Sequence, residues 1–314
     1  MVRKAFLVGI NDYAPIGPSE HDLHGCVEDA KDMANTLVIA GFPATSIRLC
    51  TNSRATKKGI MDGLDWLIKG TEKGDSLVFY YSGHGSQVPN MDLGSDDVEI
   101  DRMDEILCPH DLDFARQIYV KDDDLRAIFK KLSAGVNLEV ILDSCHSGTA
   151  TREILDPLKP ADGNGIINNG VIKRSRYIEP PIEYTFHHTY LPNLPKTRIL
   201  KPRAGEKDIV IAPELNNTLW AACRDNQTSE ETDINGVTRG VFTYYFCQVI
   251  RRSNASIIRE SLHGLVNAAL KREQIEQTPQ LEVSSQTLLT NDIFKSETVR
   301  ELPVEVKSTK KHKT

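Results

Sequence analysis

The stretches DSLVFYYSGHG (residues 75–85) and LEVILDSCHSG (residues 138–148) share one pattern, an apolar run followed at once by small and polar residues. The first run is apolar at nearly every position, as expected of a central parallel strand that is buried on both faces. In open parallel sheets, functional side chains lie just beyond the carboxyl ends of the strands. We therefore predict two neighbouring strands that bring His84 and Cys145 together, although they are far apart in the sequence.

The spacing of apolar residues predicts the remaining elements. Strands are expected over residues 4–10, 46–50, 75–81, 138–142, 218–223 and 280–283. Helices are expected over residues 22–40, 55–69, 122–132, 242–250 and 257–270. Strands that alternate with helices favour parallel βαβ units with right-handed crossovers. The fold class predicted is α/β, with an open, mostly parallel sheet of six strands and helices on both of its faces.

Composition excludes several classes of protein. Of the 314 residues, 39% are hydrophobic and 26% are charged, a balance typical of a soluble globular chain. A formal net charge of −6 argues against a nucleic-acid partner. We expect no membrane partner, because no apolar run approaches the roughly 20 residues that span a bilayer. The early apolar run is too short for a signal peptide. The six widely spaced cysteines favour a cytoplasmic protein over a zinc or disulfide scaffold.

One catalytic domain is predicted over residues 1–295, with two unusual segments inside it. Residues 90–124 are strongly acidic, whereas residues 150–207 form a long, mostly basic insertion with weak periodicity. A loop that long inside a compact domain is usually functional or disordered. Residues 296–314 form a polar tail that we expect to be disordered.

A thiol beside an imidazole is an arrangement for acyl transfer. The thiolate of Cys145 would attack a carbonyl carbon, and His84 would protonate the leaving amine. Glycines beside both residues allow backbone N–H groups to approach the developing oxyanion. Cys223, in the sequence AACRD, is the competing candidate nucleophile. It lies within a strand-like run and has no matching His-Gly turn, so Cys145 is preferred.

The segments YYSGHGSQ and VILDSCHSG resemble the paired motifs of metacaspases and their bacterial relatives, the caspase-like peptidases of family C14. LHGCVEDA, MDEILCPHD and WAACRDNQTSEE extend the resemblance over most of residues 4–290. The resemblance implies a caspase-like sheet and a cysteine endopeptidase that is a monomer.

The resemblance also implies roles for individual residues. His84 and Cys145 match the catalytic dyad, and the backbone N–H groups of Gly85 and Cys145 match the oxyanion donors. The pocket for the residue before the scissile bond would be lined by Cys26, Asp29, Ser82 and Asp143. Two carboxylates in a concave site favour a basic side chain. We therefore expect protein or peptide substrates that are cut after arginine or lysine. Each aspartate also has a simpler interpretation. Asp29 could lie on the solvated face of a helix, and Asp143 could be a turn residue that hydrogen-bonds the loop backbone.

Calcium is a hypothesis that comes from the resemblance alone. Asp104, Asp122 and Asp123 match three calcium ligands of some metacaspases, and oxygen-rich loops suit Ca²⁺. The fourth acidic position is Arg152 here, and the acidic run also fits an ordinary charged helix start. No cofactor is required for the chemistry, so calcium would act as an activator.

The basic insertion suggests self-processing. An enzyme that accepts basic residues could cut its own chain at Lys173, Arg174 or Arg176, since exposed loops are easily cleaved. A solvated loop that is never cut is the alternative. Two other functions stay open: an inactive caspase-fold adaptor, and a thiol transpeptidase or ligase that transfers the acyl group to an amine.

Overall fold

The computed structural model of the chain describes residues 1–13, 21–89, 103–145, 166–168, 171–183, 208–212, 217–224 and 227–295. Within these residues a seven-stranded sheet forms the centre of the molecule, in the order β10-β14-β11-β7-β3-β1-β2. Its strands are β1 (Arg3–Gly9), β2 (Ile47–Thr51), β3 (Ser76–Ser82), β7 (Asn137–Asp143), β10 (Ile209–Ile211), β11 (Thr218–Ala221) and β14 (Gln280–Val283). All neighbouring pairs are parallel except β11 and β14.

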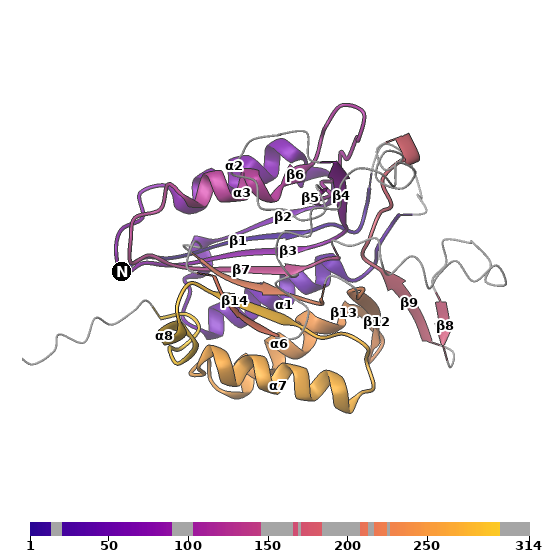
Figure 1. The fold of residues 1–314 in the computed structure, drawn as a ribbon. Coiled ribbons are helices and arrows are strands. Elements are labelled where there is room, and N and C mark those ends of the chain that lie inside the picture. The colour runs from indigo at the N-terminus through magenta and orange to yellow at the C-terminus, as the bar shows by residue number, and fades with distance from the viewer. Residues whose placement is uncertain are drawn as a thin grey trace, which may run out of the picture.

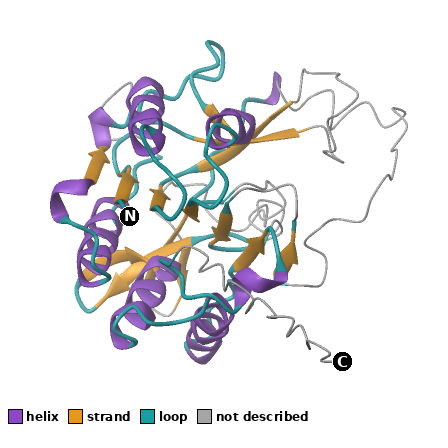
Figure 2. Ribbon diagram, turned by 90° about the vertical axis from the view of Figure 1, so that its left-hand side faces the viewer, coloured by secondary structure: helices purple, strands orange, loops and turns teal. Residues whose placement is uncertain are grey.

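Helices cover both faces of this sheet (Figure 1). They are α1 (Cys26–Ile39), α2 (Lys57–Ile68), α3 (Asp122–Phe129), α6 (Val241–Arg252), α7 (Arg259–Arg272) and the short α8 (Gln286–Leu289). Two single turns, η1 (Ala44–Ser46) and η2 (Asn52–Arg54), flank β2. Helices α2 and α3 lie on one face, and α1, α6 and α7 lie on the other. The view turned by 90° shows the same arrangement of helices on either side of the strands (Figure 2).

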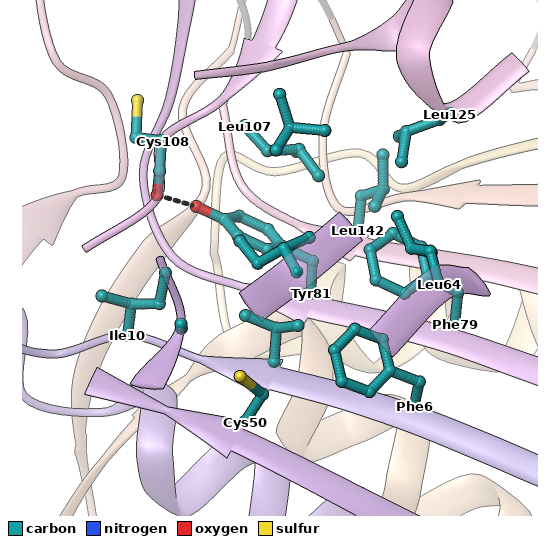
Figure 3. Close-up of a cluster of buried hydrophobic side chains, with 14 of the residues drawn as sticks. Phe6, Ile10, Cys50, Leu64, Phe79, Tyr81, Leu107, Cys108, Leu125 and Leu142 are labelled. Carbon is teal, nitrogen blue, oxygen red and sulfur yellow. Dashed lines mark hydrogen bonds between the residues drawn. The ribbon is translucent and has the colours of Figure 1, made fainter. Parts of the chain in front are cut away.

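The alternation of side chains along each strand produces two separate hydrophobic cores. Phe6 and Phe79 point to the face covered by α2 and α3, whereas Leu7 and Tyr80 point to the face covered by α1, α6 and α7. This is the period of two that a strand buried on both faces requires. Figure 3 shows part of the first core, in which the hydroxyl of Tyr81 reaches the carbonyl of Cys108 at 2.8 Å.

Two smaller sheets lie at the carboxyl end of the central strands, opposite the N-terminal label in Figure 1. One contains β4 (Gly85–Pro89), β5 (Met103–Leu107) and β6 (Val120–Lys121). The other contains β8 (Ile166–Asn168), β9 (Val171–Ser175), β12 (Glu230–Ile234) and β13 (Val237–Gly240). Asn235 and Gly236 both have positive φ, of 58° and 81°, and form the tight turn between β12 and β13.

The predicted fold class is confirmed, with differences in detail. Each expected strand and helix is present, and most of their ends lie within a few residues of the prediction. The central sheet has one strand more than expected, because β10 adds to its edge. The basic insertion has weak periodicity and was expected to be a long loop, yet its described part contains β8 and β9. The polar tail lies outside the described residues.

Two further observations concern the chain as a whole. All six cysteines are described and all are buried free thiols. No helix in the described part of the chain has the length and apolar character needed to cross a bilayer.

Candidate active site

The ends of β3 and β7 bring the two candidate catalytic residues into one site. Ser82 and Asp143, the last residues of these strands, are direct partners in the parallel register. His84 and Cys145 each follow two positions later, so their turns leave the same edge of the sheet. This is the arrangement predicted from the two quoted stretches.

Backbone hydrogen bonds fix the turn that carries His84. Its N–H donates to the hydroxyl of Tyr13 at 2.7 Å. Its carbonyl accepts from the hydroxyl of Tyr81 at 2.6 Å and from the N–H of Cys108 at 3.0 Å. The turn also needs a glycine, because a Cβ at Gly83 would lie 2.7 Å from the hydroxyls of both tyrosines. These contacts hold the backbone of His84 in place, so its imidazole is attached to a rigid turn.

The imidazole of His84 is oriented by a backbone carbonyl. Its Nε2 lies 2.6 Å from the carbonyl oxygen of His21. Since a carbonyl can only accept, Nε2 carries the hydrogen, and Nδ1 is left as the basic nitrogen. Nδ1 is buried and makes no hydrogen bond of ordinary geometry within the described residues. Burial lowers the pKa of His84 to about 3, so the ring is neutral in this state.

The thiol of Cys145 is buried against the backbone of Ser229. The N–H of Ser229 donates to the sulfur, and its carbonyl oxygen lies 3.5 Å from the same atom. The Cys145 thiol is fully shielded from solvent. The backbone N–H of Cys145 donates to the carbonyl of Arg176 at 3.2 Å, so the segment that contains Arg176 lies beside it.

Arg176 fills a pocket lined by acidic side chains. Its guanidinium contacts Asp29 at 2.7 Å and Asp143 at 2.9 Å. The hydroxyl of Ser82 accepts from the same group at 2.9 Å. Arg176 is completely buried, although arginine is almost never fully buried unless it is paired. Burial acts to lower the pKa of Arg176, but the neighbouring acids, Asp143 foremost, together raise it well above its usual value.

The backbone of Arg176 is hydrogen-bonded to the turns that follow β3 and β7. Its carbonyl oxygen accepts from the N–H of Gly85 at 3.0 Å and from the N–H of Cys145 at 3.2 Å. Its own N–H donates to the carbonyl of Ser229 at 3.1 Å. The residues before Arg176 belong to β9, which pairs with β12 in antiparallel orientation. Arg176 therefore follows directly from a paired strand. The two N–H groups named as oxyanion donors from the sequence thus converge on one carbonyl oxygen.

Both pocket carboxylates are held by the start of helix α6. Asp143 accepts hydrogen bonds from the backbone and hydroxyl of Thr243, at 3.2 and 2.6 Å. Asp29 accepts from the N–H of Gly240 at 3.0 Å. A Cβ at Gly240 would lie 2.4 Å from an oxygen of Asp143, so only glycine fits this wall of the pocket.

Burial of several acids together shifts their protonation. Burial raises the pKa of Asp29 to about 7, with Arg176 opposing and Asp143 reinforcing the shift. Burial also raises the pKa of the Cys26 thiol well above its usual value, so Cys26 is a neutral wall of the pocket. The structure thus gathers around Arg176 the four residues expected to line the pocket.

Glu231 is a third acid in the pocket, and sequence reasoning missed it. Its carboxylate is buried, lies 3.6 Å from Arg176, and accepts from the N–H groups of His24 and Gly25 at 2.8 and 2.9 Å. It belongs to β12, a strand with a largely polar sequence. The dipeptide Asn235-Gly236 is a strong hairpin signal, and it would have placed Glu231 on a strand.

The candidate processing residues differ from what the sequence predicted. The whole insertion was expected to be an exposed loop, yet Arg176 is buried because three carboxylates compensate its charge. The side chain of Arg174 is 20% exposed and lies 4.0 Å from Glu231. Lys173 is in β9, and its side chain is not described. Cys223 was placed within a strand, but β11 ends at Ala221.

The three predicted calcium ligands form ion pairs with basic side chains. Asp104 is buried and pairs with the ammonium group of Lys121. Asp122 and Asp123 both pair with Arg126, at 2.8 and 2.7 Å. No group of three or more His, Cys, Asp or Glu side chains in the described residues is placed to hold a metal ion. Arg152 lies outside those residues. Calcium activation stays a prediction, which full activity in excess chelator would contradict.

Solved structures that are similar to this chain include the following two. A protein from Geobacter sulfurreducens has a TM-score of 0.62 at 24% identity, over 94% of this chain and 99% of its own. Caspase-1 from Spodoptera frugiperda has a TM-score of 0.51 at 12% identity, over 90% of this chain and 89% of its own. At these identities the likeness shows the fold alone, and that fold is the caspase-like one.

Sequence comparison assigns the family. A model described as "Metacaspase, peptidase C14 domain" matches residues 3–153. "Metacaspase-1" of Emericella nidulans is 30% identical over 305 residues, which span 90% of this chain and 70% of the relative. The matched residues include both stretches with which the sequence argument began. The chain belongs to the metacaspase family of C14 peptidases, and it is a cysteine peptidase with a caspase-like fold.

Proposed function

We propose that the protein is an endopeptidase that cuts after arginine or lysine, and that its first substrate is its own bond between Arg176 and Tyr177. One observation carries this proposal. The guanidinium of Arg176 lies among Asp29, Asp143 and Glu231, while the carbonyl of the same residue accepts from Gly85 and Cys145. A side chain in an acidic pocket and a carbonyl in an oxyanion site are what a bound substrate would present.

The proposed chemistry uses Cys145 and His84. The sulfur of Cys145 attacks the carbonyl carbon, and its thiol proton passes to Nδ1 of His84. The N–H groups of Gly85 and Cys145 stabilise the oxyanion that forms. Collapse breaks the C–N bond, the imidazolium protonates the leaving amine, and a thioester remains. Water then attacks the thioester, gives its proton to His84, and releases a carboxylic acid and the free thiol. The carbonyl of His21 keeps the ring oriented throughout.

The docked segment also explains how the uncut chain would be restrained. Arg176 fills the pocket that any external basic residue must enter, and three buried carboxylates hold it there. Removing one partner from a buried ion pair is strongly unfavourable, so the pocket is not vacated easily. Cleavage after Arg176 removes one of the two covalent links that keep the segment in place, while the link to β9 remains. We therefore propose that self-cleavage converts a restrained chain into an active one.

A panel of short fluorogenic peptides tests the specificity. Peptides that end in arginine or lysine are expected to be hydrolysed, and one that ends in aspartate is expected to be inert, because its carboxylate would meet three others. Product analysis with an added amine separates hydrolysis from acyl transfer. Cleavage after aspartate but not after arginine would contradict the pocket assignment.

The activity is expected to depend on pH through Asp29. A carboxyl attracts a basic side chain only when it is deprotonated, and burial raises the pKa of Asp29 to about 7. As the pH falls through about 7, Asp29 takes up a proton and the pocket loses a negative charge. We therefore expect KM for an arginine peptide to rise on the acid side of about pH 7.

Two variants on the same helix test whether Asp29 causes the rise of KM at low pH. In Asp29→Asn, KM is expected to lose this rise on the acid side of about pH 7, and much of the activity should be lost as well. Asp32→Asn is the matched control, because Asp32 lies on the same helix and pairs with Arg251 outside the pocket. KM of Asp32→Asn should still rise on the acid side of about pH 7. If KM of Asp29→Asn rises at low pH as it does in the original chain, a group other than Asp29 causes the pH dependence.

A further inference from the structure

The segment that follows Arg176 is bound as closely as the segment before it. The N–H of Ile178 donates to the carbonyl of Gly85 at 3.0 Å, and Tyr177 forms a parallel bridge with Gly85. The hydroxyl of Ser86 donates to the carbonyl of Ile178 at 2.6 Å. Both polar backbone groups of Ile178 are therefore fixed by β4.

The side chain of Ile178 is placed in an apolar environment. It is 4% exposed and belongs to the core cluster that also contains Val88 of β4 and Leu107 of β5. Neither of its neighbours is equally buried by apolar packing, since Tyr177 is half-buried and Glu179 is exposed. The alternation matches an extended strand that directs every second side chain into the protein.

We propose that this site is a specificity pocket for substrates, which takes an aliphatic side chain two residues after the cleaved bond. The inference rests on the proposed function, because it takes Arg176–Tyr177 as the scissile bond. A protein substrate would replace the chain's own segment and make the same two bonds to Gly85 and Ser86. The enzyme would then select a basic residue before the bond and an aliphatic residue after it, in one extended strand.

Self-cleavage separates the part of the segment that follows Arg176 from the part that precedes it. Hydrolysis turns Tyr177 into a new amino terminus, which is held from one side only. We therefore expect the segment beginning at Tyr177 to exchange with substrate peptides.

Peptides based on the chain's own sequence test the proposal on the self-processed full chain. The parent peptide is KRSRYIEP (residues 173–180), labelled with a donor and a quencher. Replacing the position of Ile178 by Asp or Gly is expected to lower kcat/KM by about 10- to 100-fold. The matched control replaces the position of Glu179 by Gln, and we expect less than a threefold change. In the full chain, Ile178→Asp should slow self-cleavage, whereas Glu179→Gln should not.

The outcomes separate this inference from the function on which it rests. If the parent peptide is cleaved after arginine but its Asp and Gly variants are cleaved equally well, the pocket does not select substrates and the inference is wrong. If the parent peptide is not cleaved after arginine at all, the proposed function fails first. Ser86→Ala gives a further check, because it should lower kcat/KM for every peptide while the aliphatic preference persists.

Discussion

Replacing Cys145 with alanine is expected to lower peptide hydrolysis by about 10⁴- to 10⁶-fold, to the level of residual binding effects. In the proposed mechanism this thiol supplies the covalent step beside the two oxyanion donors. Hydrolysis of a fluorogenic arginine peptide measures the effect. The same variant should leave the chain uncut, because self-cleavage uses the same thiol.

Cys223→Ala is the matched control for this prediction. Cys223 is also a buried free thiol at the end of a neighbouring strand, and it contacts the carbonyl of Gln227 at 3.4 Å. Its sulfur also lies 4.0 Å from the carbonyl oxygen of Ser144. The variant is expected to keep activity within a few-fold of the original chain. Loss of activity in Cys223→Ala together with full activity in Cys145→Ala would transfer the nucleophile to the competing cysteine.

Asp143→Asn is expected to lower kcat/KM for an arginine peptide by about two orders of magnitude, or about 3 kcal/mol. The variant keeps the shape of the side chain but removes a buried charge 2.9 Å from the bound guanidinium. A peptide that ends in citrulline has nearly the shape of arginine without its charge, so it reports the charge alone. The ratio of arginine to citrulline hydrolysis should collapse in the variant.

Asp32→Asn is again the suitable control, because it also removes a carboxylate that is paired with an arginine. Asp32 lies outside the pocket, so the ratio of arginine to citrulline hydrolysis should not change. If Asp143→Asn lowers hydrolysis of both peptides equally, Asp143 maintains the structure of the site and does not select the charge. Circular dichroism of both variants shows whether each of them is folded or unfolded.

The central sheet could be predicted from sequence because its strands carry a strong local signal. Residues 77–81 (LVFYY) and 140–142 (VIL) are unbroken apolar runs, and their length and flanking turns identify them as parts of buried parallel strands. The ends of those strands then placed His84 and Cys145 together without any three-dimensional information. The edge strand β10 has only three residues and no comparable signal.

The rest of the site depends on contacts between distant segments. His21 contributes a backbone carbonyl, which every residue type possesses, so no sequence pattern marks it. Glu231 belongs to a polar hairpin, and its burial follows from pairing with a segment more than 50 positions away. Arg176 could be named as one of three basic candidates in the insertion. Only the geometry of the acidic pocket shows that Arg176, and not Arg174, occupies it.

The mass of the purified full-length chain tests the central claim most directly. After incubation, the account predicts two fragments, residues 1–176 and a second fragment that begins at Tyr177, and an intact chain in Cys145→Ala. Arg176→Gln should also remain uncut at this bond, because it cannot satisfy the three carboxylates. An intact chain that hydrolyses arginine peptides at full rate, or a chain cut only elsewhere, would contradict the claim that Arg176 is docked as the first substrate.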